Sequence, residues 1–463
     1  MAAAKKALSR TGARKSASGG ARTNEASSGN APSLVPPHGP AGIRVRMFRI
    51  GFGDFFLLSV PAAGGYKHIL IDCGVHATDL KTIRTAVQQM AQDCNFHLSL
   101  VIMTHRHADH ISGFGTCSDI FKQITVDRVW MPWFENRSDK TALAFQAGLT
   151  SLATRLAMRL AARNDERSLE LAKMADNITG GLNAAGVAAN QKALDVLHGG
   201  FKNKVEPDYY KAGDTAKLPD DLIQAGLTAE ILGPPIDPKV IAQMNRKSQQ
   251  YLVGDTGTED ETAKLFSKAF ECDEKAYQGE ALKFFDADEI KALIDGAQPD
   301  VLAARAAAAD KTLNNQSLVV LFGFAGKYLL FAGDAQWGNW ENFLYGGAYG
   351  TSGHTELTPK AKAILNKIDF YKVGHHGSTN ATPKDAVAAM RLGCAGMCST
   401  QIDTYNGVPR EPLLDALRAR MNGQLARSDQ VRASTEVPAN DKAGPLPSLF
   451  KEPTRMLFID YEL

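Results

Sequence analysis

The residues with the clearest chemical potential in this chain of 463 residues are Thr-His-Arg-His-Ala-Asp-His at positions 104 to 110. Three imidazoles and one carboxylate fall within six positions, directly after the apolar run Leu98 to Met103. A lone histidine in such a place is usually structural, but a satisfied core does not hold ionisable groups at this density. Imidazole and carboxylate are the ligands that Zn²⁺ and similar divalent ions take in catalytic sites. The stretch therefore predicts a metal site with His105, His107, Asp109 and His110 as ligands.

The elements that must position these side chains are apolar runs of strand length. Residues 98–103 form one such run, and three others also end in ionisable residues. Residues 69–71 precede Asp72, residues 328–332 precede Gly333-Asp334, and residues 371–373 precede Gly374-His375-His376. Because each run ends in a carboxylate or an imidazole, we expect four buried strands whose ends meet at one rim, with the metal ions there.

These four motifs resemble, in type and in order, those of the metallo-β-lactamase superfamily, whose signature is His-x-His-x-Asp-His. The resemblance implies an α/β (α+β) fold, an αββα sandwich with helical insertions. In the family, the aspartate matching Asp72 braces the metal loop without binding metal, and the aspartate matching Asp334 bridges two ions.

A narrower resemblance is to the C-terminal metallo-hydrolase domain of ComEC-type competence proteins and their free-standing relatives, which include bacterial phosphorylcholine esterases. Three stretches carry it: Gly51-Phe52-Gly53-Asp54 where those proteins have Gly-Gln-Gly-Asp, Asn314-Asn315-Gln316-Ser317-Leu318-Val319, and the Gly-His-His-Gly-Ser run from Gly374 to Ser378. Together the similar parts span about residues 43–135, 206–235 and 313–425.

The resemblance implies two divalent metal ions, zinc foremost and manganese as the alternative. His105 and His107 would bind the first ion, Asp109 and His110 the second, and Asp334 would bridge them. His376 is favoured over His375 as the last ligand, because its spacing to Ser378 is similar to that in RNase Z-like and β-CASP enzymes. The catalytic residues would then be Asp109, Asp334 and His375, with His375 either a proton donor or a packed, satisfied histidine, and Asp54, Asp72 and Ser378 would support the ligands.

Two departures from the family pattern are visible. Many members have a third histidine for the first ion, which here falls at Leu313, and the only histidine between His110 and Asp334 is His198. We expect Asn314 or Asn315 to take its place. The site of the first ion would then bind Zn²⁺ more weakly than a three-histidine site, and Mn²⁺ would support activity. The ComEC-type Tyr-Gly-His-Pro is replaced by residues 405–410, Tyr-Asn-Gly-Val-Pro-Arg, so the role of that histidine is not carried over.

Composition and charge narrow the class of protein. No run approaches the ~18 apolar residues of a membrane span, and the N-terminus lacks the apolar core of a secretory signal. Cysteine is sparse, and Cys394 and Cys398 are expected to pack as small buried hydrophobes. These features favour a cytoplasmic protein without a membrane partner.

Residues 1–42 are rich in Ala, Ser, Gly, Lys and Arg, and six cations against one carboxylate give this segment a net charge of +5. Such a segment cannot bury enough surface to fold, so we expect a disordered basic tail, either a solubilising one or a tether to nucleic acid or an anionic surface. With +2 overall, residues 43–463 carry −3. They should form one domain that begins near Ile43, with a half-buried or edge strand over residues 43–50 and helical insertions at about 138–205 and 236–312.

The predicted function is that of a metal-dependent hydrolase which uses a metal-activated hydroxide, since the pKa of metal-bound water falls from ~15.7 towards ~7. The resemblance makes a phosphoester, and above all a phosphodiester, the expected substrate. The net charge of −3 favours a small molecule or a single-stranded nucleic acid. Two alternatives stay open: hydrolysis of a carboxylic ester, lactone or amide on the same fold, and a non-catalytic partner-binding module with a vestigial site.

Overall fold

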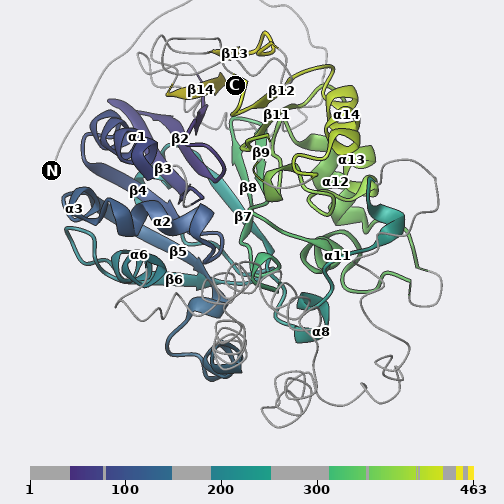
Figure 1. The fold of residues 1–463 in the computed structure, drawn as a ribbon, viewed down its shortest axis with the longest axis horizontal. Helices are drawn as coiled ribbons and strands as arrows, with labels where there is room; N and C mark the ends of the chain where they lie inside the picture. The colour runs from purple at the N-terminus through teal and green to yellow at the C-terminus, as the bar shows by residue number, and fades with distance from the viewer. Residues whose placement is uncertain are drawn as a thin grey trace, which may run out of the picture. The chain divides into compact units, whose positions relative to one another are not determined.

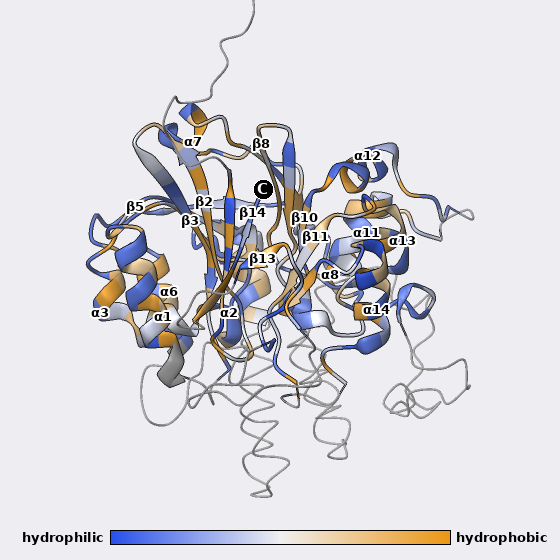
Figure 2. Ribbon diagram, turned by 90° about the horizontal axis from the view of Figure 1, so that it is seen from above, coloured by the Kyte–Doolittle hydropathy of each residue, from blue (hydrophilic) through white to orange (hydrophobic). Residues whose placement is uncertain are grey.

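Two mixed β-sheets face each other, and helices cover the outer face of each (Figures 1 and 2). The computed structural model describes residues 42–76, 80–148, 189–251, 312–350, 354–402, 404, 407–430, 445–451 and 457–463. The predicted αββα arrangement is confirmed. Among the described residues, no helix is both long and apolar enough to cross a bilayer.

The first sheet has the strand order β13-β14-β1-β2-β3-β4-β5-β6. Strands β13, β14, β1, β2 and β3 pair antiparallel, whereas β3, β4, β5 and β6 run parallel. The bounds are Arg44–Phe48 (β1), Phe55–Ala62 (β2), Gly65–Cys73 (β3), His97–Ile102 (β4), Thr125–Pro132 (β5), Pro207–Tyr210 (β6), Phe450–Lys451 (β13) and Phe458–Glu462 (β14).

The second sheet has the order β12-β11-β10-β9-β8-β7. Strands β7, β8 and β9 pair antiparallel, and β9 to β12 run parallel. The bounds are Thr228–Gly233 (β7), Val319–Phe324 (β8), Lys327–Phe331 (β9), Phe370–Lys372 (β10), Ala395–Cys398 (β11) and Leu425–Arg427 (β12).

Apolar side chains on both faces of each sheet form three buried layers. Leu58 and Ile102 of the first sheet pack with Phe322 and Phe331 of the second in the core between the sheets. The outer face of the first sheet packs on α1 (Leu80–Asp93), α2 (Ala108–Thr116), α3 (Ser118–Phe121) and α6 (Ala189–Leu197). The outer face of the second packs on α11 (Trp337–Tyr345), α12 (Pro359–Lys367), α13 (Lys384–Ala389) and α14 (Glu411–Arg420). Two short helices, α7 (Asp220–Gln224) and α8 (Pro238–Ile241), lie in the connections.

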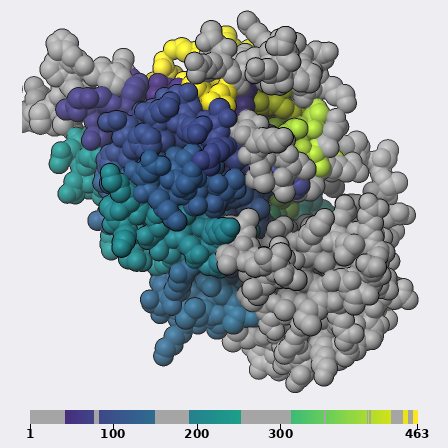
Figure 3. Space-filling model, turned by 60° about the vertical axis from the view of Figure 1, so that its left-hand side comes forward, coloured from purple at the N-terminus to yellow at the C-terminus, as the bar shows by residue number. Residues whose placement is uncertain are grey.

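The strand predicted over residues 43–50 is present as β1, but it is neither an edge strand nor half buried. It lies between β14 and β2, so that the C-terminal strands, yellow in Figure 3, come beside the purple N-terminal ones. Arg46 on this strand is 6% exposed and donates two 2.7 Å hydrogen bonds to Asp460 of β14. The arginine can be buried because this carboxylate neutralises it, and an alternating pattern alone does not reveal such a partner.

Most of the tail and of both predicted insertions lies outside the described residues, so these boundaries stay predictions. Of the first insertion, α6 is described and packs against α2, the helix that carries two of the predicted ligands. Cys394 and Cys398 are fully buried with unpaired thiols, as predicted.

Candidate metal centre

The carboxyl ends of the parallel strands bring the predicted ligands to one rim. β4 ends at Ile102, the following loop carries His105 and His107, and the first turn of α2 carries Asp109 and His110. In the second sheet, β9 and β10 lead to Asp334 and His376 in the same way. Parallel neighbours end at the same edge of a sheet, so each sheet contributes part of the ligand set.

Four of the six predicted ligands converge in one group. Asp109, His110, Asp334 and His376 each offer an atom, and these four atoms all lie within 4.8 Å of one another. His110 Nε2 is 3.1 Å from Asp334 Oδ2, and His376 Nε2 is 3.1 Å from Asp109 Oδ2 and 3.4 Å from Asp334 Oδ2. A tetrahedral ion with ligands at ~2.0–2.1 Å requires ligand separations of ~3.3–3.4 Å, so the donor atoms and their spacing fit a divalent ion.

The two imidazoles of this group are held so that Nε2 faces the centre. Asp72 Oδ2 is 2.8 Å from Nδ1 of His110, and the same carboxylate accepts hydrogen bonds from the amide and hydroxyl of Thr104, at 2.7 and 2.6 Å. Nδ1 of His376 is 2.8 Å from the carbonyl oxygen of Ser399. A carboxylate or carbonyl behind a histidine fixes its ring and leaves the other nitrogen free for metal, and Asp72 therefore has the bracing position expected of it.

His105 and His107 form a separate pair. His105 Nε2 lies 3.0 Å from His107 Nδ1, and the rings of His105 and His110 have centroids 4.1 Å apart, so the pair adjoins the four-residue group. Among the described residues, no third imidazole or carboxylate joins this pair in a group of metal-ligand geometry. The predicted ligands are thus divided unequally among the described residues, into a group of four and a pair of imidazoles.

The two asparagines predicted to replace the missing histidine have different environments. Asn314 is 3% exposed, its Nδ2 lies 3.3 Å from Nε2 of His375, and its Oδ1 has no hydrogen-bond partner. Asn315 instead donates to the carbonyls of Ile241 and Gln243 and accepts from the amides of residues 336 and 339. Of the two candidates, Asn315 thus holds backbone segments together, whereas Asn314 lies beside His375 with an Oδ1 that has no hydrogen-bond partner.

His375 does not join the four-ligand group. Its Nδ1 lies 2.6 Å from Ser378 Oγ and 3.0 Å from Asn380 Oδ1. Ser378, whose spacing favoured His376 as the ligand, therefore contacts His375. Both histidines have positive φ, 42° and 51°, a conformation that side chains of this size rarely adopt. Such strain costs about 1–3 kcal/mol per residue and is typical of functional sites. The turn places His376 against Asp109 and leaves His375 half-buried beside Asn314.

A buried lysine that we did not predict lies beneath the centre. Lys372, 2% exposed, makes a close ion pair with Asp54 Oδ2, donates to the carbonyl of Gly333 at 3.1 Å and lies 3.7 Å from Asp334 Oδ1. Asp54, Asp72 and His110 also have the geometry of a metal-binding group, but Lys372 already supplies a cation to Asp54. The signal in the sequence was a single lysine within an otherwise apolar strand.

The Gly-Phe-Gly-Asp loop before β2 packs directly on the backbone of residues 104–110, here called the metal loop. The amide of Asp54 donates to the carbonyl of Asp109 at 2.9 Å. A Cβ on Gly53 would come within 2.7 Å of that same carbonyl oxygen, and one on Gly74 within 2.3 Å of the amide nitrogen of His110. Both glycines are required because the two backbones approach more closely than any side chain permits.

The charges of the group are strongly interdependent. Burial alone would lower the pKa of His110 and of His376, but Asp334 and the other carboxylates outweigh it and raise both pKa values. Burial would likewise raise the pKa of Asp334, yet His110 and His376 hold it well below its usual range. Burial and the neighbouring imidazoles lower the pKa of His105. Without metal, the carboxylates therefore favour the charged forms of His110 and His376, whereas burial and the neighbouring imidazoles favour the neutral form of His105.

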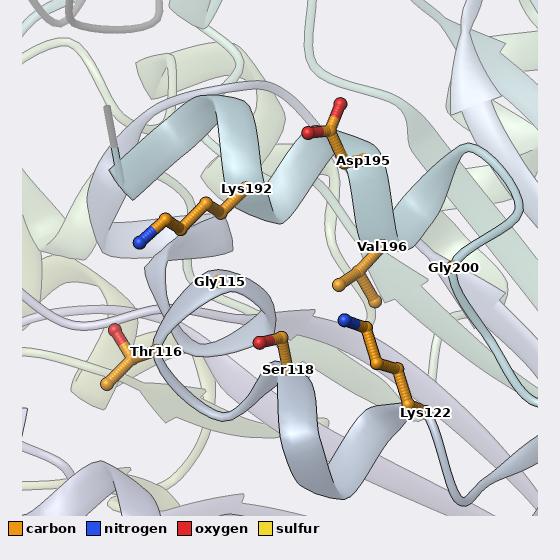
Figure 4. A pocket seen from close by; sticks show the side chains of 8 residues that line it. All are labelled: Gly115, Thr116, Ser118, Lys122, Lys192, Asp195, Val196 and Gly200. Carbon is orange, nitrogen blue, oxygen red and sulfur yellow. The ribbon is translucent and has the colours of Figure 1, made fainter. Parts of the chain in front are cut away.

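Two other features flagged by the sequence or the surface lie apart from this centre. His198 hydrogen-bonds with the hydroxyl of Tyr209 at 3.1 Å and belongs to neither metal-ligand group among the described residues. A hollow of about 710 Å³ between α2, α3 and α6 is lined by Lys122, Lys192, Asp195 and small residues (Figure 4). It contains no imidazole, so it does not offer the chemistry of the rim.

No model of a known protein family matches the chain, and no curated protein matches it either. The geometry of the rim is therefore the feature that bears most directly on function.

Proposed function

We propose that this chain is a metal-dependent hydrolase of the metallo-β-lactamase type that acts on phosphoesters, above all phosphodiesters. One observation carries the proposal: Asp109, His110, Asp334 and His376, from two sheets and distant parts of the chain, converge within 4.8 Å beside the His105–His107 pair. A vestigial site would not need to keep each imidazole held by a partner behind it, as Asp72 holds His110.

When bound, two divalent ions would supply hydroxide near neutral pH and hold anionic oxygens of the substrate. The chain's own residues orient the ligand atoms and balance the charges of the group. Asp334 directs Oδ2 to the two histidines of the group, while Oδ1 accepts a 3.1 Å hydrogen bond from the amide of His375. Asp109, with 19% of its side chain exposed, is the most open member of the group and marks the side from which a substrate approaches.

His375 and Asn314 are the polar groups placed to contact the substrate beside the ions. Ser378 and Asn380 hold Nδ1 of His375. Its Nε2, which Asn314 Nδ2 contacts at 3.3 Å, is the ring nitrogen that would have to exchange this contact for one with a substrate oxygen. The free Oδ1 of Asn314 supplies an oxygen donor of the kind that harder ions such as Mn²⁺ accept. Since residues 43–463 carry a net charge of −3, a small or single-stranded phosphodiester suits the protein better than duplex nucleic acid.

A panel assay tests the proposal. Purified protein would be offered bis-p-nitrophenyl phosphate, single- and double-stranded DNA, RNA and a lactone, each with Mn²⁺ and with Zn²⁺. We expect turnover of bis-p-nitrophenyl phosphate and of at most one of the three nucleic acids. Turnover of the lactone alone would move the assignment to carboxylic esters, and no turnover with metal bound would indicate a binding module.

A further inference from the structure

The metal centre is assembled from two halves that different sheets carry. Asp109 and His110 follow β4 of the first sheet, whereas Asp334 and His376 follow β9 and β10 of the second. A shift of one sheet against the other would change the two 3.1 Å separations between these halves, His110 to Asp334 and His376 to Asp109. Something must therefore fix the two halves relative to each other where they meet.

The Asp54–Lys372 ion pair joins the halves at that point. Asp54 belongs to the first half, because its amide donates to the carbonyl of Asp109 at 2.9 Å. Lys372 belongs to the second: it is the last residue of β10, and its ammonium donates to the carbonyl of Gly333 at 3.1 Å. Both side chains are 2% exposed, so solvent does not screen their attraction.

We propose that Asp54 and Lys372 are a positioning pair that sets the spacing of the two half-sites, and that Lys372 acts on the metal ions through Asp334. The ammonium lies 3.7 Å from Asp334 Oδ1, whereas His110 approaches the other oxygen, Oδ2, at 3.1 Å. Together with the amide of His375, it keeps Oδ1 turned to the protein and leaves Oδ2 as the single oxygen offered to the ions.

Stability alone does not account for this pair. Taking two charges out of water is costly, and well-packed neutral side chains of similar size are often as stable or more so. Asp54 also lies close to two of the predicted ligands. Its carboxylate oxygens are 3.7 Å from Nδ1 of His110 and 3.6 Å from Nδ1 of His376. One ion pair therefore adjoins three of the four converging ligands and both halves of the centre.

The test is the double variant Asp54→Asn/Lys372→Met, which removes one negative and one positive charge and so leaves the net charge near the ions unchanged. Metal binding to metal-free protein is measured by isothermal titration with Mn²⁺ and Zn²⁺, and the melting temperature is measured without metal. Arg46→Met/Asp460→Asn is the control, because it neutralises a largely buried ion pair that contacts none of the ligands; it also removes the arginine that pairs with Asp93. Asp54→Asn alone is isosteric and provides a second variant, in which the ammonium of Lys372 loses Asp54 as its anionic partner and keeps its 3.7 Å contact with Asp334.

We expect the Asp54/Lys372 double variant to melt close to the wild type but to bind metal roughly 10–100-fold more weakly, the range typical of residues that support a ligand. Asp54→Asn should lose affinity in the same direction, and the control pair should not. Wild-type affinity in both Asp54 variants would overturn the inference. The inference rests on the proposed metal centre but not on its reaction: a wild type that binds ions tightly and hydrolyses nothing would overturn the proposed function alone.

Discussion

Asp334 is the residue on which the two halves of the centre depend most directly. Its Oδ2 lies within 3.4 Å of Nε2 of both His110 and His376, so Asp334→Ala removes a ligand shared by the converging group. We expect loss of at least one ion and nearly all turnover, with the fold retained, because the sheets are held by their apolar core. Metal analysis and circular dichroism of the purified variant check both parts.

Asp72→Ala provides the contrast, because Asp72 contacts His110 from behind and does not face the centre. The expected loss of metal affinity or activity is roughly 10–100-fold, not complete. Equal and complete loss in both variants would mean that Asp72 is itself a ligand or that the fold is lost.

The adjacent pair Asn314 and Asn315 separates a role at the centre from a role in the fold. Asn315→Ala leaves two carbonyls and two amides without their partner and should lower the free energy of unfolding by about 1–3 kcal/mol or more. Asn314→Ala removes an oxygen that has no partner, so stability should hold while binding of one metal equivalent weakens. Denaturant titration and metal titration of both variants would show the opposite pattern if the assignments were reversed.

The raised pKa values of His110 and His376 predict how the protein responds to pH. Although burial lowers them, Asp334 and the neighbouring carboxylates outweigh burial. A raised pKa stabilises the metal-free fold fully below the unfolded value of ~6.5 and ceases to do so as the pH rises through the folded value. Metal-free protein should thus lose melting temperature above pH ~6.5.

Binding of metal must displace the same protons, so metal affinity should rise over this pH range. Titrations in two buffers of different ionisation enthalpy would measure the protons released. Binding without proton release would contradict the paired state inferred for these histidines.

At the scale of elements, the sequence predicted the strands well because each is an apolar run that ends in an ionisable residue. β3, β4, β9 and β10 all lie where such runs occur, and four of the six predicted ligands converge beyond the ends of β4, β9 and β10. What the sequence could not predict depends on partners distant in the chain. Nothing near Lys372 indicates Asp54, and two adjacent asparagines give no sign of which one faces the centre.

The close approach of the Gly-Phe-Gly-Asp loop to the metal loop predicts that a side chain added at Gly53 disturbs metal binding. A Cβ on Gly53 would lie 2.7 Å from the carbonyl oxygen of Asp109, whereas one on Gly64, in the turn between β2 and β3, meets nothing within 4 Å. Both glycines have positive φ, so alanine strains the backbone at each. Gly53→Ala should weaken metal binding, and Gly64→Ala should affect only the melting temperature. Equal metal binding in the two variants would mean that the loop does not hold Asp109.

At the scale of the whole molecule, the proposed metal-dependent site lies at the rim where the ends of strands from both sheets meet. The helices of each outer layer bury the backs of the sheets, and apolar side chains from both sheets fill the core between them. A group of four ligands and a pair of imidazoles predict that the protein binds two ions with unequal affinity.

The most direct test is to titrate metal-free protein with Mn²⁺ or Zn²⁺ and to follow hydrolysis of bis-p-nitrophenyl phosphate at each addition. The account predicts no turnover without metal, tight uptake of a first equivalent, and turnover that reaches a plateau when a second, weaker equivalent is bound. Turnover that survives complete removal of metal, or two bound equivalents that give no turnover of any phosphodiester, would contradict it.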